Sequence, residues 1–440
     1  MKFLSTWLLW LGIITNLSCA SYAENVNFNV PIEAVYFTDA TDIDGDGVDD
    51  VVISAQIDAF AQLGISCCEV PASLIKDIEG VIPQVYLSNY GNPKFLELPS
   101  EASTHRTWAG AFFKIQGQQY YLHGRNGELG LPSENRGERS QIYRIEIKDG
   151  EVNFKLVAEF PSKTTTASVD VRNVGTSVEI IENNYNSFGS GAEVYRSHIY
   201  NFNANEVLTD VNPSFGLRTD IAHNEVRYST ILEGFVLTAT EVWKNNSGTV
   251  TLTRNPASYY TSGNTKIDLI PVLYESNHAG FSVTEFLVEG KIIVLEMSSE
   301  FFGHQNGGYK GSSIALYELN TETYELDLCR EDCILPRLNL PTLTQVYFKK
   351  IDLNFDGIDE VYVTGYRDGE IQIFHIDETE LRQIGSRGFE LQDVGGWFGR
   401  AHLLRDEDNA CVFSISSIAN FSTGTRTVPI RISSCRTRRL

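Results

Sequence analysis

Two acidic segments are the parts of this chain whose residue types and spacing could do chemistry. The first reads Asp42-Ile43-Asp44-Gly45-Asp46-Gly47-Val48-Asp49-Asp50 and places five carboxylates within nine residues. Like charges this close repel one another, so a folded loop of this composition needs a cation to hold it. Oxygen donors at alternate positions, with glycines where the chain turns sharply, suit Ca²⁺. The segment therefore predicts a calcium-binding loop.

The same spacing returns near the other end of the chain. The second segment reads Asp352-Leu353-Asn354-Phe355-Asp356-Gly357-Ile358-Asp359-Glu360, with its glycine in register with Gly47. An EF-hand would require a bidentate Glu at position twelve and a helix on each side. Position twelve is Ile53 in the first segment and Val363 in the second, and both belong to apolar β-branched runs. We expect both loops to close at position nine and to join two strands.

A nine-residue acidic loop that runs into an apolar strand resembles the FG-GAP (or VCBS) repeat of integrin-α-type β-propellers and many secreted bacterial proteins. The resemblance implies calcium ligands in both copies. In the first copy they are the side chains of Asp42, Asp44, Asp46 and Asp50 with the Val48 carbonyl, and in the second those of Asp352, Asn354, Asp356 and Glu360 with the Ile358 carbonyl. Two departures from the family pattern are Glu360, where Asp is usual, and the missing Phe-Gly…Gly-Ala-Pro signature.

The N-terminus has the pattern of a secretory signal peptide. Lys2 precedes an apolar run over residues 3–14, and Ser21-Tyr22-Ala23 supplies small residues at both positions of a cleavage site. The run is too short to span a membrane, and no second candidate span follows. Cys19 is a poor lipidation site because Asn16 stands where an apolar residue is needed. We expect residues 1–23 to be removed and the protein to be periplasmic or secreted.

Charge and cysteine content fit an exported protein. The formal net charge is −22, and a surface this acidic disfavours nucleic acid and anionic lipid as partners. Removal of Cys19 leaves six cysteines, an even number that predicts disulfides in an oxidising compartment. We expect a disulfide between Cys411 and Cys435 and a second between Cys329 and Cys333. The adjacent Cys67 and Cys68 have no predicted partner.

The rest of the chain repeats an apolar strand, a tight turn and a second apolar strand at intervals of about sixty residues. The turns lie at Gly47, Gly117, Gly175, Gly234, Gly290, Gly357 and Asp408. Two further strands fit between turns, as at 140–147 with 153–159 and at 313–319 with 324–328. Four strands per interval predict an all-β fold: residues 24–440 form one seven-bladed β-propeller of four-stranded blades. The calcium loops would join strands A and B of their blades.

The loops between strands B and C should lie on the opposite face from the calcium loops, because successive strands alternate in direction. Several of these loops are long and rich in Gly, Asn and aromatic residues, which indicates a contact surface as well as ordinary turn chemistry. The candidate ligand-contacting residues are Trp243, Tyr259, Tyr260, Phe302, His304 and Tyr309.

No catalytic motif is present: the sequence has no Gly-x-Ser-x-Gly, no His-Glu-x-x-His and no phosphate-binding loop. We therefore expect no catalytic residues and a non-catalytic calcium-binding propeller that acts as an adhesion or scaffold module for a protein or glycan. The alternative is a Ca²⁺-dependent carbohydrate-active enzyme, of lyase or dehydratase type, with a pocket on the loop face. Convergence of His123, Arg125, His304 and Tyr309 in one pocket would favour the enzyme.

Overall fold

The structure is a computed structural model in which a set of separate segments is described. These are residues 21–28, 32–57, 80–87, 94–126, 138–161, 166–184, 198–211, 222–229, 231, 236–246, 249–260, 266–268, 278–288, 290–302, 308–323, 325–328, 344–351, 360–367, 370–376, 381–388, 399–406, 409–416 and 426–435. Within them the regular structure is β, apart from one 3-10 turn, η1 (Ser100–Ala102). No helix in these segments is long and apolar enough to cross a membrane.

The strands of these described segments form seven four-stranded antiparallel sheets. The first three in chain order contain β2 (Ile32–Thr41), β3 (Asp50–Ile57), β4 (Gln84–Leu87) and β5 (Lys94–Glu97); β6 (Arg106–Ile115), β7 (Gln118–Asn126), β8 (Gln141–Lys148) and β9 (Glu151–Glu159); and β10 (Thr166–Val174), β11 (Ser177–Asn184), β12 (His198–Asn203) and β13 (Leu208–Asp210). The next three contain β14 (Ala222–Tyr228), β15 (Val236–Asn246), β16 (Thr249–Tyr260) and β17 (Lys266–Asp268); β18 (His278–Val288), β19 (Lys291–Phe302), β20 (Gly308–Leu319) and β21 (Leu326–Leu328); and β22 (Thr344–Ile351), β23 (Glu360–Arg367), β24 (Glu370–Ile376) and β25 (Leu381–Gly388). The last sheet contains β26 (Gly399–Asp406), β27 (Asn409–Ser416), β28 (Arg426–Cys435) and β1 (Ser21–Phe28).

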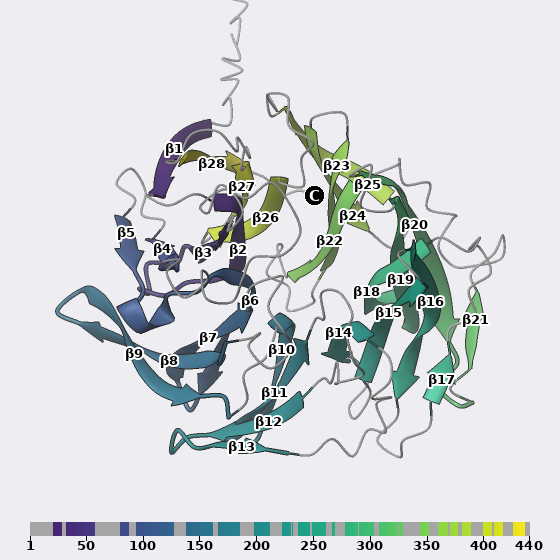
Figure 1. Ribbon diagram of the computed structural model, residues 1–440, viewed down its shortest axis with the longest axis horizontal. Coiled ribbons are helices and arrows are strands. Elements are labelled where there is room, and N and C mark those ends of the chain that lie inside the picture. Colours follow the sequence, from purple (N-terminus) through teal and green to yellow (C-terminus); the bar gives the residue numbers. More distant parts are fainter. Residues whose placement is uncertain are drawn as a thin grey trace, which may run out of the picture.

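The sheets follow one another around a common centre, with the first strand of each nearest to it (Figure 1). Six sheets keep their strands in chain order, whereas the last has the order β1-β28-β27-β26. The chain's first strand thus pairs with its last, from Ser21↔Ser433 to Phe28↔Arg426. The all-β prediction and the four-stranded antiparallel sheets are confirmed, and a β-propeller fits this arrangement. The predicted cleavage position, after Ala23, falls inside β1.

Tight hairpins join the strands where the sequence predicted turns. Between β6 and β7 the two turn residues, Gln116 and Gly117, have φ of 51° and 85°. Positive φ at both central residues is the two-residue turn whose twist matches that of paired strands, and glycine adopts it without steric cost. The turn at Gly175 also joins its two strands, since Val174 pairs with Ser177. The turns near 234, 357 and 408 lie outside the described residues.

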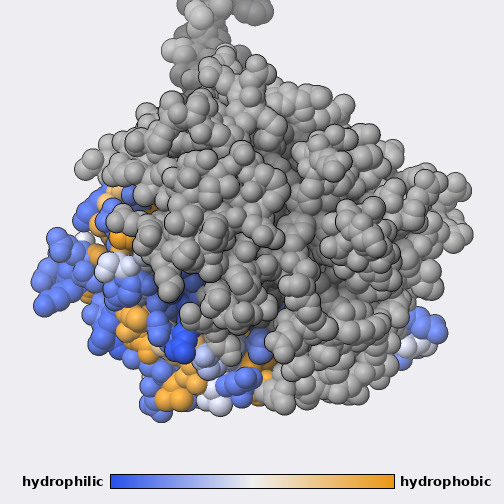
Figure 2. Space-filling model, viewed as in Figure 1, coloured by the Kyte–Doolittle hydropathy of each residue, from blue (hydrophilic) through white to orange (hydrophobic). Residues whose placement is uncertain are grey.

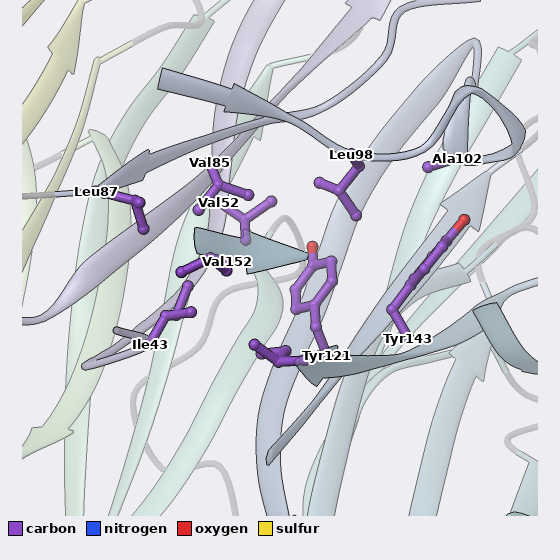
Figure 3. Close-up of a cluster of buried hydrophobic side chains, with 10 residues drawn as sticks. Ile43, Val52, Val85, Leu87, Leu98, Ala102, Tyr121, Tyr143 and Val152 are labelled. Atoms are coloured by element: carbon purple, nitrogen blue, oxygen red, sulfur yellow. The ribbon is translucent and has the colours of Figure 1, made fainter. Parts of the chain in front are cut away.

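Successive sheets pack face to face through apolar side chains. Because side chains alternate along a strand, neighbouring residues of β7 serve different cores. Tyr121 packs towards the β2–β5 sheet with Val52, Val85 and Leu98, as Figure 3 shows. Tyr120 packs in the other core, which includes residues of β10–β13. The visible part of the described surface is mostly hydrophilic, with apolar side chains in separate small patches (Figure 2).

Carboxylates on inner strands also join one sheet to the next. Asp39 of β2 accepts a hydrogen bond from the Phe112 amide of β6 at 2.7 Å, and Asp170 of β10 accepts one from the Tyr228 amide of β14 at 2.6 Å. In each pair both residues lie at or beyond the middle of their strands. Neighbouring inner strands therefore run in the same direction, and their first hairpins lie at the same end of the molecule.

The register of the last sheet does not support the predicted Cys411–Cys435 disulfide. Cys411 pairs with Ser434, and Cys435 pairs with Ala410. The two cysteines are one residue out of register, and a one-residue offset changes the face of the sheet on which a residue lies. The other cysteines of interest, Cys67, Cys68, Cys329 and Cys333, lie outside the described residues.

Candidate functional site

The first acidic loop connects two paired strands of one sheet. β2 ends at Thr41 and β3 begins at Asp50, and these two residues pair with each other. Position twelve, Ile53, is a fully buried residue of β3. The expected strand–loop–strand arrangement is therefore present in place of an EF-hand. We call residues 42–50 the metal loop.

Three carboxylates converge in the metal loop. Asp42, Asp44 and Asp50 each offer one oxygen, and these oxygens all lie within 4.8 Å of one another. Backbone amides hold each group in place: Gly45 N donates to Asp42 Oδ1 at 2.7 Å, Asp46 N to Asp44 Oδ1 at 3.1 Å, and Ile43 N to Asp50 Oδ2 at 2.8 Å. Each carboxylate oxygen has a second lone pair that a cation could use.

The sequence of the metal loop explains its shape. Gly45 and Gly47 have φ of 84° and 89°, a conformation that residues with a Cβ rarely adopt. Ile43 and Val48 are buried and fix the loop to the core. The glycines allow the chain to turn, and the buried apolar residues fix the loop to the core. Together they keep the carboxylates close to one another.

Asp46 stands outside the convergent group of three, although the sequence predicted it as a ligand. It is exposed, and its Oδ1 accepts a hydrogen bond from Val48 N at 2.9 Å. Desolvation raises the pKa of Asp46, the nearby charges of Asp44 and Asp42 raise it further, and the hydrogen bond from Val48 opposes them. The three converging hard oxygen donors fit a divalent cation such as Ca²⁺.

The second acidic loop, 352–359, lies outside the described residues, but the strands on either side of it are described. Ile351, the last residue of β22, pairs with Glu360, the first residue of β23. This pairing closes the second loop with the same register that Thr41↔Asp50 gives the first. Glu360 therefore occupies the strand position of Asp50.

A second polar group lies at the other end of the β6–β9 sheet. The Gln119 side chain, next to the β6–β7 turn, donates to the Asp42 carbonyl at 2.8 Å, so this turn lies beside the metal loop. Arg125 is six residues further along β7, which corresponds to about 20 Å of strand. Thr104 and His105 precede β6, and Glu138 precedes β8. We call Thr104, His105, Arg125 and Glu138 the polar cluster.

Glu138 is the centre of the polar cluster. Its Oε1 lies 2.9 Å from His105 Nδ1, and its Oε2 accepts a hydrogen bond from Thr104 Oγ1 at 2.5 Å. Arg125 Nε is 3.1 Å from Oε2, an ion pair by distance whose angle is not that of a hydrogen bond. Burial acts to raise the pKa of Glu138, but the hydrogen bonds from His105 and Thr104 and the charge of Arg125 outweigh it and hold the pKa below its usual value.

Next to the polar cluster, a buried node of hydrogen-bonded side chains links two sheets; its members are Ser140, Thr166 and Glu182. Ser140 Oγ and Thr166 Oγ1 both donate to Glu182 Oε1 at 2.6 Å. The Arg125 amide donates to Ser140 Oγ at 3.2 Å, which links the node to the cluster. Gly124 is required beside it, because a Cβ there would lie 2.9 Å from the Ala109 carbonyl oxygen and 3.0 Å from Thr166 Cγ2. These contacts fix the end of β7 against its neighbours.

Three of the four residues proposed to converge in an enzyme pocket belong to described strands: His123, Arg125 and Tyr309. His123 and Arg125 belong to β7, not to a loop. His123 is fully buried, with Nε2 3.1 Å from the Ala102 carbonyl oxygen. Desolvation and the charge of Arg125 lower the pKa of His123 to about 3. A neutral, inaccessible imidazole cannot exchange protons with a substrate, so His123 is wrong as a candidate acid or base.

The aromatic residues predicted to form one contact surface do not all lie at the same end of their sheets. Trp243 lies in β15 and Tyr259 and Tyr260 in β16, in strands and not in loops. Tyr259 pairs with Leu237 while Trp243 pairs with Leu252, so the two aromatic positions are six residues, or about 20 Å, apart along β15. Tyr259 and Tyr260 therefore lie towards the opposite end of their sheet from Trp243. The register of β15 and β16 determines this position, not the distance between the residues in the sequence. Phe302 ends β19, and Tyr309 is the second residue of β20. His304 lies outside the described residues.

The sequence alone did not predict the polar cluster. His105 and Glu138 are separated by 33 positions and form no recognisable motif. Glu138 lies two residues before the predicted strand 140–147, but no comparable signal in the sequence marks His105. Pairing them would have required the register of β6, β7 and β8.

No family model and no curated protein matches the sequence. Among solved structures, the fold is similar to that of an α-L-arabinanase of Penicillium chrysogenum complexed with arabinobiose, at 13% identity and a TM-score of 0.42, over 77% of this chain and 95% of that one. A polysaccharide lyase is similar at 10% identity and a TM-score of 0.47, over 94% and 99%. A sialidase of Trypanosoma rangeli is similar at 12% identity and a TM-score of 0.41, over 79% of this chain and 56% of the sialidase.

All three of these proteins are named as carbohydrate-processing enzymes. The prediction of a non-catalytic adhesion or scaffold module is wrong on this comparison, as is the expectation that the chain is not an enzyme.

Proposed function

We propose that this chain is an exported enzyme that processes a glycan at the end of its sheets opposite the metal loop. The observation that carries the proposal is the polar cluster. It combines an imidazole, an ionised carboxylate and a guanidinium within hydrogen-bonding or ion-pair distance, and His105, Glu138 and Arg125 keep 24%, 17% and 15% of their side chains exposed. Ionisable groups with perturbed pKa values cluster at functional sites, and such sites need side chains that a rigid element holds in place.

The glycan as substrate class follows the names of the similar structures, and the residues are compatible with it. A sugar presents hydroxyl groups, which need both donors and acceptors for orientation. The guanidinium of Arg125 has five N–H donors, and the carbonyls of Ser103 and Arg139 accept only two of them. Trp243 of β15, Phe302 of β19 and Tyr309 of β20, with His304, remain proposed ligand contacts, although their sheets do not adjoin the β6–β9 sheet.

The proposed metal is Ca²⁺, and its role is structural. Asp42, Asp44 and Asp50 would hold it, joined by Asp46 and the Val48 carbonyl if the resemblance to FG-GAP repeats holds in full. A bound cation would neutralise the mutual repulsion of these carboxylates. The metal loop is about 20 Å along β7 from the polar cluster, too far for the ion to contact a substrate there. The second loop would use Asp352, Asn354, Asp356, Glu360 and the Ile358 carbonyl.

The remaining parts of the proposal concern the fold and its location. The seven sheets would be the blades of one propeller over residues 24–440, closed where β1 joins β28. Closure of the ring by the first strand protects the sheet edge that would otherwise be open. Export would depend on residues 1–23 as a signal peptide. Cleavage after Ala23 would leave the pairs from Glu24↔Ile430 to Phe28↔Arg426 to hold the ring closed.

The test is turnover of polysaccharides by the purified full-length mature protein in the presence of Ca²⁺. A panel of neutral and acidic polysaccharides is incubated with wild type, Arg125→Gln and Arg172→Gln, and new reducing ends are measured. Arg172 is the matched control: it pairs with Glu179 at 2.6 Å near the opposite end of its sheet. We expect wild type and Arg172→Gln to cleave one class of polysaccharide and Arg125→Gln to lose at least tenfold. Equal cleavage by both variants would contradict a reaction at the polar cluster.

A further inference from the structure

We propose that one ordered water molecule is bound between the β2–β5 and β6–β9 sheets, where it bridges His123, Arg125 and Ser54. This inference goes beyond the proposed function and does not depend on it. Three polar atoms lead to it: His123 Nδ1, Arg125 Nε and Ser54 Oγ are inaccessible to solvent and have no hydrogen-bond partner in the part of the chain that the structure describes. Buried polar atoms in native proteins nearly always have a partner, which is either a protein group or ordered water.

His123 presents a hydrogen-bond acceptor to this site. Its Nε2 lies 3.1 Å from the Ala102 carbonyl oxygen, and a carbonyl can only accept, so Nε2 carries the ring proton. Desolvation and the charge of Arg125 lower the pKa of His123 to about 3, so the ring is neutral near pH 7 and Nδ1 keeps its lone pair. His123 is fully buried, and an acceptor without a donor there would leave the loss of its hydration uncompensated.

Ser54 and His123 lie at the same level of the interface between the two sheets. Val52 of β3 and Tyr121 of β7 belong to the core of this interface (Figure 3). Side chains alternate along a strand, so Ser54 and His123, each two residues further on, face the same core. Both strands begin at the metal-loop end and run in the same direction, because Asp50 closes the metal loop and the β6–β7 turn lies beside that loop. The two orphan atoms therefore approach each other from facing sheets.

The β7 side of the site has space for a small molecule and a donor to hold it. Gly110 of β6 pairs with His123, so no side chain from β6 fills the space beside the imidazole. Arg125 is two residues further along β7 and on the same face. Arg125 Nε lies 3.1 Å from Glu138 Oε2, but the angle is not that of a hydrogen bond, so the Nε hydrogen still needs an acceptor.

The charges at the site favour a neutral molecule that both donates and accepts. Only a donor can satisfy His123 Nδ1, which excludes a simple anion. A metal or ammonium ion would lie beside the Arg125 guanidinium and be repelled by it. Water donates to His123 Nδ1, accepts from Arg125 Nε and shares a third hydrogen bond with Ser54 Oγ, and three is the usual number for a buried water. The water would thus tie the end of β7 to β3 of the next sheet.

The test counts long-lived water molecules in the full-length mature protein with Ca²⁺. Magnetic relaxation dispersion of water deuterons is compared between wild type, His123→Phe and His198→Phe, and a wild-type crystal structure is determined at a resolution that shows ordered water. The larger ring in His123→Phe accepts no hydrogen bond and fills the space beside it. His198 is the control, because it is a half-buried histidine of β12, outside this interface. Thermal melting identifies the variants that fold.

We expect wild type and His198→Phe each to hold one more long-lived water than folded His123→Phe. In the wild-type crystal structure, a water should lie within hydrogen-bonding distance of His123 Nδ1, Arg125 Nε and Ser54 Oγ. Equal counts in wild type and folded His123→Phe would overturn the proposal, and so would a crystal structure in which the site is empty or Ser54 bonds directly to His123. If His123→Phe does not fold, the wild-type crystal structure decides the question alone.

Discussion

Replacing Asp44 by Asn should have opposite effects on the metal-free and the Ca²⁺-bound protein. Asp44, Asp42 and Asp50 have oxygens within 4.8 Å of one another. At that separation two unit charges repel by about 0.9 kcal/mol with the dielectric constant of water and about 3.5 kcal/mol at an effective value of 20. Since Asp42 and Asp44 are partly exposed, the lower figure is the safer one. The metal-free loop therefore carries roughly 3 kcal/mol of repulsion.

Asp44→Asn removes two of the three repelling pairs and keeps an oxygen that can accept the hydrogen bond from Asp46 N. The metal-free variant should be more stable than metal-free wild type by about 2 kcal/mol. For a chain of 440 residues this corresponds to a melting temperature about 2 °C higher. Wild type should gain about 3 kcal/mol from Ca²⁺ at a hundred times the dissociation constant, and the variant clearly less.

The assay is thermal melting in excess EDTA and in millimolar Ca²⁺. Asp149→Asn is the control: it removes the same charge from an exposed turn, where φ of 55° suits Asn as well as Asp. Its Ca²⁺-dependent shift should equal that of wild type. A lower melting temperature of Asp44→Asn in EDTA, together with an unchanged response to Ca²⁺, would refute the reasoning, because it would mean that the three carboxylates do not form a cation site.

Three shorter predictions concern other parts of the molecule. Because the pKa of His123 is about 3 when folded and about 6.5 when unfolded, the unfolded chain binds the extra proton, and stability should fall as pH drops from about 6.5 towards 3. Urea denaturation should show that the loss between pH 7.5 and pH 5 is smaller by about 2 kcal/mol in His123→Gln. Gly124→Ala should lower the free energy of unfolding by about 1–3 kcal/mol in the same assay, because its Cβ would press on Ala109 and Thr166. Asn354→Asp should tighten Ca²⁺ binding at the second loop, seen by calorimetry, since it restores the carboxylate that Asp44 supplies in the first.

The repeating strands could be predicted from sequence because the signals are local. The turn at Gly117 and the strands after it follow from apolar runs separated by residues that accept positive φ. The metal loop is local too, since all of its carboxylates come from nine consecutive residues and their spacing alone brings three of them together. The loop composition even specifies its anchors, Ile43 and Val48.

Contacts that depend on register could not be predicted in this way. Tyr259 and Trp243 lie on adjacent strands, yet Tyr259 pairs with Leu237, six residues along β15 from Trp243, so the two lie towards opposite ends of one sheet. Cys411 and Cys435 lie on paired strands, but a one-residue offset separates them. A shift of a single residue changes the face of a strand, and no local pattern in either strand specifies that shift.

Register also explains why the polar cluster could not be predicted, although the strands around it were. His105 and Glu138 meet because β6 and β8 both pair with β7, so the residues that precede β6 and β8 come together beside the end of β7. The same strand carries Gln119 beside the metal loop and Arg125 in the polar cluster, both on the face that packs against β2–β5. β7 thus connects the two sites and keeps them about 20 Å apart. The metal loop lies at one end of the sheet, and the partly exposed polar groups lie at the other end.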